Sequence, residues 1–164
     1  MRWVRFAIFV CVVTLVQASV LDVIAVTALR IGPDLLLILL VFFAVYFNTT
    51  EAVIAAFTVG FAADLVVGVM GPRTISFGMF GTALAYLNRV IAVRQKPYQS
   101  LAIFAVGILA GLVGHILSLL KSQPVASNIL ARIFWTSLYS AAIGPFLFLP
   151  CAWWMRIKTH RFNR

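Results

Sequence analysis

Apolar residues fill six stretches of the chain, and short breaks of polar residues, glycine or proline separate them. The stretches cover residues 3–21, 34–47, 52–70, 74–93, 98–120 and 132–155. A transmembrane helix needs about 20 predominantly apolar residues, within a range of about 17–25. The second stretch has only 14 residues, and a bilayer that thins locally accommodates such a short helix at a modest energetic cost. The pattern therefore predicts six transmembrane helices.

The breaks carry signals for helix ends. Pro33 and Asp34 stand at the start of the second stretch, where a carboxylate suits the helix dipole and the free amides of a first turn. Residues 48–51 have capping-box spacing before the third stretch, and Gly71 with Pro72 separates the third from the fourth. No break exceeds about a dozen residues, so we predict one polytopic membrane domain over residues 1–164.

The composition agrees with a membrane protein. Hydrophobic residues make up 63% of the chain and charged residues 10%, whereas soluble domains average about 45–50% and about 25%. We therefore predict an all-α integral membrane protein. The net charge of +9 does not indicate a nucleic-acid partner, because the basic residues cluster where apolar stretches end.

The distribution of these basic residues predicts the orientation in the membrane. Six spans place both termini on one side, and nine of the 13 basic residues fall on that side. Cytoplasmic loops carry an excess of Lys and Arg, so we expect cytoplasmic N- and C-termini. An alternative is a cleaved signal peptide, with an n-region at 1–5, an h-region at 6–15 and a cleavage site at 16–18.

Signatures of catalysis and of metal or cofactor binding are missing from the sequence. The chain has no P-loop, HExxH or GxSxG motif, and only four acidic residues. Its two cysteines, Cys11 and Cys151, lie within apolar stretches without metal-ligating neighbours. We therefore expect no enzymatic activity, no cofactor and no metal.

A carboxylate lies inside the third apolar stretch. An ionisable group at the centre of a membrane helix costs about 2.5–3.5 kcal/mol and is kept when it has a partner or a function. Ala52, Ala56, Gly60, Asp64 and Gly68 follow one another at every fourth position, so they share one helix face. Such a stripe favours close helix–helix contact. We interpret Asp64 as a residue that fixes helix packing.

His115 shares a face with Gly107 and Gly111 in the fifth stretch, which gives that helix a small-residue stripe of its own. On the predicted topology, Asp64 and His115 lie at similar depth in the outer half of the membrane. Two interpretations stay open. The two side chains contact each other, or each one bonds separately to backbone or water.

Two further features concern helix shape and surface. Pro145 lies near the middle of the last stretch, where a kink would shape a groove for a partner. Aromatic residues wrap around the second stretch near the inner leaflet, and they form either a partner or lipid surface or a part of the bundle's packing. These residues are Phe42, Phe43, Tyr46 and Phe47.

Several motifs together resemble the rod-shape-determining protein MreD family of bacteria. They are Pro33-Asp34-Leu-Leu-Leu-Ile, Gly60-Phe-Ala-Ala-Asp64-Leu-Val-Val-Gly68 followed by Gly71, Ala83-Leu-Ala-Tyr86-Leu, Phe134-Trp-Thr-Ser137 and Pro145-Phe-Leu-Phe148. The order and spacing of the motifs carry the resemblance, which covers nearly the whole chain. Gly71-Pro72 departs from the family's usual Leu-Gly at that turn.

The resemblance implies a multi-pass subunit of the bacterial cell inner membrane, within the elongasome or Rod complex that supports peptidoglycan synthesis and rod cell shape. It implies the bitopic protein MreC as the main partner, and MreB, RodA, a class B penicillin-binding transpeptidase and membrane lipids as further partners. It also implies a fold similar to the substrate-binding subunits of energy-coupling-factor transporters.

Two function classes follow from the resemblance and from the residues. The first is a non-catalytic scaffold that holds MreC and the synthases together. The second is a small-molecule-binding or lipid-binding subunit of a membrane transporter, with Asp34, Asp64 and His115 lining a cavity. A site for a polar solute needs several convergent hydrogen-bonding groups, and the predicted spans offer few.

Overall fold

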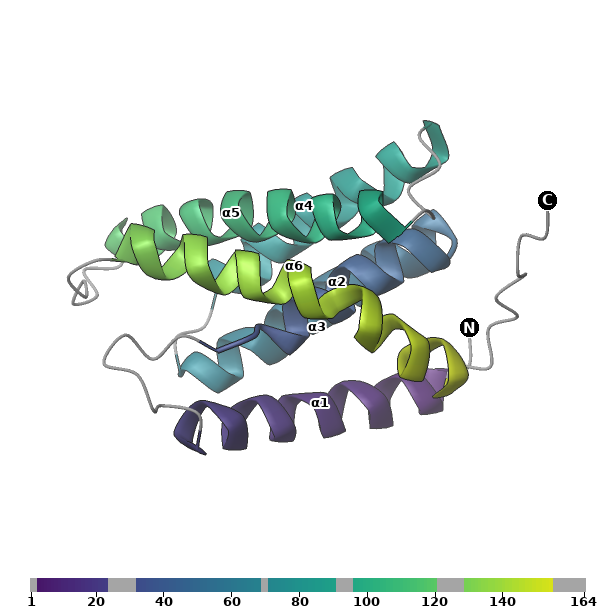
Figure 1. The fold of residues 1–164 in the computed structure, drawn as a ribbon, viewed down its shortest axis with the longest axis horizontal. Helices are drawn as coiled ribbons and strands as arrows, with labels where there is room; N and C mark the ends of the chain where they lie inside the picture. The colour runs from purple at the N-terminus through teal and green to yellow at the C-terminus, as the bar shows by residue number, and fades with distance from the viewer. Residues whose placement is uncertain (1–2, 24–31, 69–70, 91–95, 121–128, 155–164) are drawn as a thin grey trace.

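The computed structural model describes residues 3–23, 32–68, 71–90, 96–120 and 129–154. These residues form six helices and no strand (Figure 1). The helices are α1 (Trp3–Val23), α2 (Leu35–Tyr46), α3 (Thr49–Val67), α4 (Pro72–Val90), α5 (Lys96–Leu120) and α6 (Ile129–Trp154). The predicted all-α fold is confirmed.

The last four helices begin two or three residues before the predicted apolar stretches. Polar residues or proline extend α3, α4 and α5, since the first turn of a helix tolerates a missing amide proton, and the apolar residues 129–131 extend α6. Asn48 is the N-cap of α3, but its side chain makes no capping hydrogen bond, so the predicted capping box does not form. The ends predicted at residues 93 and 155 lie outside the described residues.

Helix α2 lies at the centre of the bundle. Every residue from Leu36 to Val45 is buried, with at most 3% of its surface exposed. Its 12 residues give a length of about 18 Å, whereas the hydrocarbon core of a bilayer is about 30 Å thick. Because other helices and not lipid surround α2, its length does not have to match the bilayer. This explains the short second stretch.

The other helices surround α2 in the order α1, α3, α4, α5, α6. Each of the five contacts α2 in the described part of the chain, and neighbours in this order contact each other. The pair α6 and α1 is the exception, since their described Cα atoms do not approach within 8 Å. Side chains still cover α2 between these two helices, because residues 36–45 are all buried.

Small residues allow the closest helix contacts. A Cβ placed on Gly60 of α3 would lie 2.8 Å from the Cα of Thr74 in α4, so only glycine fits between these two backbones. Gly81 of α4 meets Ala56 in the same way, and Gly107 of α5 meets Ser137 of α6. The stripes predicted on α3 and α5 are thus helix-packing surfaces.

Gly68 does not belong to the α3 stripe, and the prediction of a helix running to residue 70 is wrong at this point. Gly68 is the C-cap of α3, with a φ of 76° in the left-handed region that favours glycine. No atom lies within 4 Å of a Cβ placed on it. Its role is to end the helix, while Ala52, Ala56, Gly60 and Asp64 are all buried.

The aromatic residues of α2 pack inside the bundle. Phe42 and Phe43 have no exposed surface. Phe42 contacts Phe148 of α6, with ring centroids 5.5 Å apart, and Phe43 contacts Phe6 of α1 at 5.0 Å. Of the two interpretations left open by the sequence, packing within the bundle therefore holds for these two residues.

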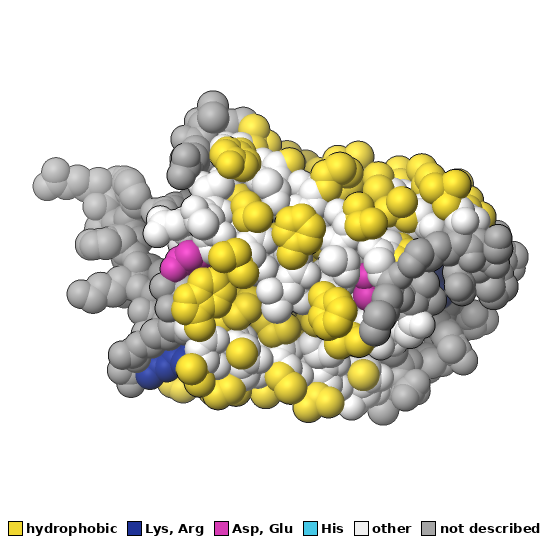
Figure 2. All heavy atoms as spheres, turned by 180° about the vertical axis from the view of Figure 1, so that it is seen from behind, with side chains coloured by type: hydrophobic (Ala, Val, Ile, Leu, Met, Phe, Trp, Pro, Cys, Tyr) yellow, Lys and Arg dark blue, Asp and Glu magenta, His cyan; other side chains and the backbone are white. Residues whose placement is uncertain are grey.

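Large apolar side chains cover the outside of the bundle. Exposed examples occur on α1, α3, α4, α5 and α6, and they include Ile8, Phe61, Met79, Leu109 and Phe146. Figure 2 shows such side chains over the middle of one face, with the few visible charged side chains towards its two ends. A soluble monomer rarely exposes so much apolar surface.

Three helices in the described residues are long and apolar enough to cross a membrane: Thr49–Val67, Tyr98–Leu120 and Ile129–Trp154. Trp3–Ser19 and Leu35–Tyr46 are shorter apolar helices. Together with the apolar exterior, they identify a membrane protein.

Candidate functional site

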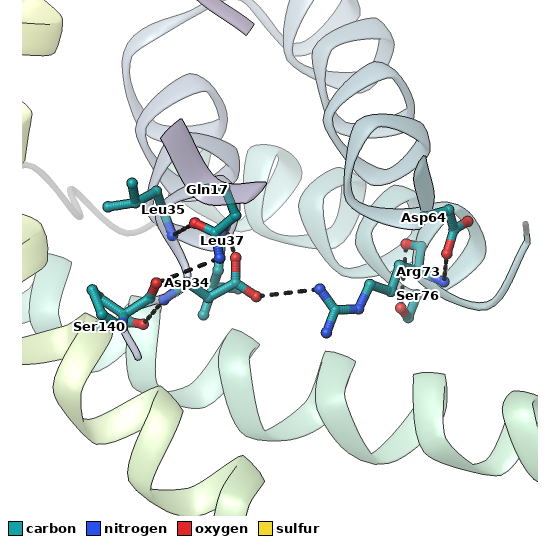
Figure 3. Close-up of polar contacts among 9 residues, drawn as sticks. Gln17, Asp34, Leu35, Leu37, Asp64, Arg73, Ser76 and Ser140 are labelled. Atoms are coloured by element: carbon teal, nitrogen blue, oxygen red, sulfur yellow. Dashed lines mark hydrogen bonds and ion pairs between the residues drawn. The ribbon is translucent and has the colours of Figure 1, made fainter. Parts of the chain in front are cut away.

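Side chains from α1 and α6 meet at the first turn of α2 (Figure 3). Gln17 Oε1 accepts a hydrogen bond from the Leu35 amide at 2.8 Å, and Ser140 Oγ accepts one from the Asp34 amide at 2.8 Å. Asp34 is the N-cap, and its Oδ1 accepts from the Leu37 amide at 3.1 Å. The prediction that Asp34 serves a helix N-terminus is confirmed. These bonds satisfy amides that a helix start leaves free.

The buried carboxylate Asp64 serves a second helix start, that of α4. It is 1% exposed. Its oxygens accept hydrogen bonds from the amides of Gly71, Arg73 and Thr74 at 2.7, 2.9 and 2.9 Å, and from the Thr74 hydroxyl at 2.6 Å. The carboxylate therefore caps α4 from the preceding helix, and its negative charge lies at the positive end of the α4 dipole.

Arg73 connects the two helix starts. Its backbone amide donates to Asp64, and its side-chain Nη1 lies 3.8 Å from Asp34 Oδ2. Figure 3 shows the Arg73 side chain extending from the α4 start towards Asp34. The Arg73 side chain is 38% exposed, and an exposed ion pair at this distance contributes little free energy.

The other end of α2 also has buried polar partners. Asn88 Nδ2 donates to the Val45 carbonyl at 2.8 Å, and Gln99 Nε2 donates to the Tyr46 hydroxyl at 3.0 Å. The last carbonyls of a helix have no partner within the helix. Because α2 is shorter than the bilayer, both of its ends need partners from the protein; Asn88 supplies one for the Val45 carbonyl, and Gln99 fixes the Tyr46 side chain.

Asp64 and His115 do not bond to each other. The described hydrogen bonds of Asp64 all come from Gly71 and the first turn of α4, and His115 lies partly exposed on α5. The second of the two open interpretations therefore holds for Asp64. Residues seven to ten positions along the chain, at the start of the next helix, satisfy the carboxylate.

The remaining candidates have packing roles or stay untested. Gly60 lies against the backbone of Arg73 and Thr74, and so holds the α3–α4 turn close to Asp64. Helix α6 continues through Pro145 without interruption. Two residues that bond to these helix starts were missed from the sequence: Ser140, which is buried, and Thr74, which is partly buried. The sequence does contain a pattern that could have indicated Ser140, since Ser137, Ser140 and Gly144 share one helix face as small residues.

The hydrogen bonds of this arrangement hold helix ends in place. Within the described ranges, no group of three His, Cys, Asp or Glu side chains could hold a metal ion. Among the described buried side-chain atoms, Asn88 Oδ1 is the one that lacks a partner. The oxygens of Asp34, Asp64 and Gln17 are engaged in bonds that hold helix starts in place.

A comparison with protein families identifies the chain. The family model described as rod shape-determining protein MreD matches residues 1–158. The chain belongs to the MreD family. No curated protein and no solved structure matched the chain. Membership in the family gives this membrane protein a role in determining rod cell shape.

Proposed function

We propose that this MreD-family protein is a non-catalytic scaffold of the elongasome, and that it binds MreC in the bacterial inner membrane. In this role it supports peptidoglycan synthesis and rod shape beside MreB, RodA and a class B penicillin-binding transpeptidase. All six helices cross the membrane, with both termini in the cytoplasm. A fold like that of energy-coupling-factor substrate-binding subunits belongs to the same proposal.

The observation that carries the proposal is that the buried polar side chains bond to backbone amides at helix starts. Asp64 accepts four hydrogen bonds from Gly71 and the first turn of α4, and Gln17 and Ser140 bond to the start of α2. A site for a polar solute needs several free donors and acceptors that converge on it. In this protein the buried polar side chains bond to helix starts instead.

The exterior supports binding to other membrane proteins. The breaks in the sequence are too short for a soluble docking domain, so partners meet this protein in the bilayer or at its edges. Five of the six helices expose large apolar side chains there. Helix association in membranes depends on packing and a few polar bonds, and these faces supply packing surface.

Depletion in a rod-shaped bacterium tests the scaffold role. We expect depleted cells to become round and to regain rod shape when the protein is restored. The alternative role as a solute-binding or lipid-binding transporter subunit predicts a different result: depleted cells keep their shape and lose uptake of a solute. That outcome would overturn the scaffold proposal.

Reporter fusions test the orientation. A reporter active only in the cytoplasm, fused after Arg164, is expected to be active. A reporter active only outside, inserted within residues 121–127, is expected to be active as well. An external location of the C-terminus would refute the charge assignment.

A further inference from the structure

The start of α1 and the end of α6 lie together at one end of the bundle (Figure 1). The rings of Phe9 in α1 and Trp154 in α6 stack there with centroids 6.2 Å apart. Arg5 precedes Phe9 by four residues, which places it about 6 Å further along the axis towards the start of α1. The Arg5 side chain is partly exposed. The fold therefore brings a basic residue of α1 to the end of the bundle at which α6 ends.

Three tryptophans mark this end of the bundle as the level of the membrane surface. Trp3, Trp153 and Trp154 are all exposed, and Trp153 is the most exposed, at 80%. The Trp3 ring packs edge-on against Phe6 with centroids 6.0 Å apart, and Phe6 packs against Phe43 of the central helix. Tryptophan is enriched where a membrane meets water, because its ring suits the headgroup level. Lipid headgroups are therefore expected next to the start of α1 and the end of α6.

The sequence concentrates basic residues at the same end of the bundle. Residues 1–5 and 155–164 hold six of the 13 Lys and Arg residues: Arg2, Arg5, Arg156, Lys158, Arg161 and Arg164. None of the four acidic residues lies in these two segments. Arg156 and Lys158 follow Trp154 by two and four residues, so even a fully extended chain keeps them within about 7 and 14 Å of it. Salt screens attraction beyond about 8–10 Å, so these charges act on the nearby membrane surface.

We infer that residues 1–5 and 155–164, together with the exposed tryptophans beside them, form a binding surface for the headgroups of anionic phospholipids. Clusters of about four to eight Lys or Arg residues next to a membrane helix are typical of segments that bind such lipids. The chain reaches that number because the fold joins the ends of α1 and α6. Lipid is favoured over a nucleic acid or an acidic soluble protein, because the charges begin within two residues of a tryptophan at the headgroup level.

This surface is separate from the proposed scaffold role. It depends neither on MreC nor on the side of the membrane at which the termini lie. A chain that binds anionic lipid here but does not bind MreC would refute the proposed function and leave the inference in place.

Lipid retention by the purified full chain tests the surface. The chain is mixed in mild detergent with equal amounts of phosphatidylglycerol, which is anionic, and phosphatidylethanolamine, which has no net charge. Native mass spectrometry then gives the ratio of the two lipids that stay bound. We expect the wild-type chain to retain phosphatidylglycerol preferentially.

A pair of variants with equal loss of charge locates the binding. The test variant is Arg156→Gln/Lys158→Gln, and the control is Lys121→Gln/Arg132→Gln. Lys121 directly follows α5 and Arg132 lies in the first turn of α6, at the opposite end of α6 from Trp154. A basic residue near a membrane surface changes lipid binding by about fivefold. We therefore expect the bound-lipid ratio of the test variant to fall at least about fivefold, and that of the control to stay within about twofold of the wild type.

Three results would overturn the inference. The first is a wild-type chain without preference for phosphatidylglycerol. The second is a test variant that keeps the wild-type ratio, including one that loses an acidic protein or a nucleic acid instead of lipid. The third is an equal fall in both variants, because net charge and not this surface would then attract the lipid. If the test variant does not fold, a salt series on the wild-type chain decides: raising salt from 0.1 to 1 M shortens the screening length from about 10 to about 3 Å, and an unchanged preference would refute the charge attraction.

Discussion

Removal of the Asp64 carboxylate is expected to destabilise the protein strongly. In the variant Asp64→Leu, the amides of Gly71, Arg73 and Thr74 lose their acceptor. The site is 1% exposed, so water does not replace the lost bonds without a rearrangement of the α4 start. The variant Asp64→Asn has nearly the same shape and keeps one acceptor oxygen.

The contacts give the size of the two effects. A buried amide left without a partner costs about 1–3 kcal/mol. At the lower end of this range, three such amides lower the free energy of unfolding by about 3 kcal/mol. This lowers the ratio of folded to unfolded protein by roughly 100-fold. In Asp64→Asn, an oxygen at the Oδ2 position keeps the contacts with Gly71 and Thr74, and only the Arg73 amide loses its acceptor. That loss costs about 1–3 kcal/mol.

The assay is the fraction of monodisperse protein that remains after a temperature series in mild detergent, measured by fluorescence-detected size-exclusion chromatography. Leu65→Ala, at a neighbouring residue that is 51% exposed, is the matched control and is expected to behave like the wild type. We expect the order wild type, Asp64→Asn, Asp64→Leu from most to least stable. Equal stability of Asp64→Leu and the wild type, or equal damage by Asn and Leu, would refute the capping role.

Three further variants test other parts of the structure with the same assay. Gly60→Ala is expected to lower the free energy of unfolding by about 1–3 kcal/mol, because its Cβ would lie 2.8 Å from the Thr74 backbone. The control Gly114→Ala, with no atom closer than 3.5 Å, is expected to leave stability unchanged. Equal effects of the two variants would contradict the close α3–α4 contact. Gln17→Leu is expected to lower the free energy of unfolding by about 1–3 kcal/mol, because the Leu35 amide loses its acceptor. The control Ser19→Ala removes only an exposed hydrogen bond within α1 and is expected to change stability little. Arg73→Gln is expected to cost under about 1 kcal/mol, and a much larger loss would show that the 3.8 Å ion pair with Asp34 is stronger than its exposure indicates.

The sequence predicted the features that depend on residues close together in the chain. The apolar stretches located all six helices, and the four-residue spacing of Ala52, Ala56 and Gly60 located a packing face that the structure confirms. Asp34 directly after Pro33 predicted a helix cap, which also depends only on neighbouring residues in the chain. Such signals need only a turn or two of helix to be recognised.

The partners of the buried polar residues were not predictable from the same patterns. The donors to Asp64 are mostly backbone amides, and every residue except proline carries one, so the sequence does not mark Gly71 or Arg73 as partners. Ser140 bonds to Asp34 across 106 positions of the chain. Only the packing of α6 against α2 brings them together.

The error at Gly68, and the choice between the two interpretations of the α2 aromatic residues, have definite physical causes. Glycine suits both a close helix contact and a left-handed helix end, and the regular spacing favoured the first role for Gly68 where the structure shows the second. Phe42 and Phe43 lie on a helix that is apolar on all sides, and such a helix is buried. The aromatic residues there serve the core of the bundle.

The most direct test of the scaffold role is affinity purification of the full chain in mild detergent, followed by mass spectrometry of copurified proteins and of bound small molecules. The account predicts that MreC copurifies in amounts comparable to the chain, and that no small polar solute is retained. A tightly bound vitamin-like solute together with absence of MreC would contradict it.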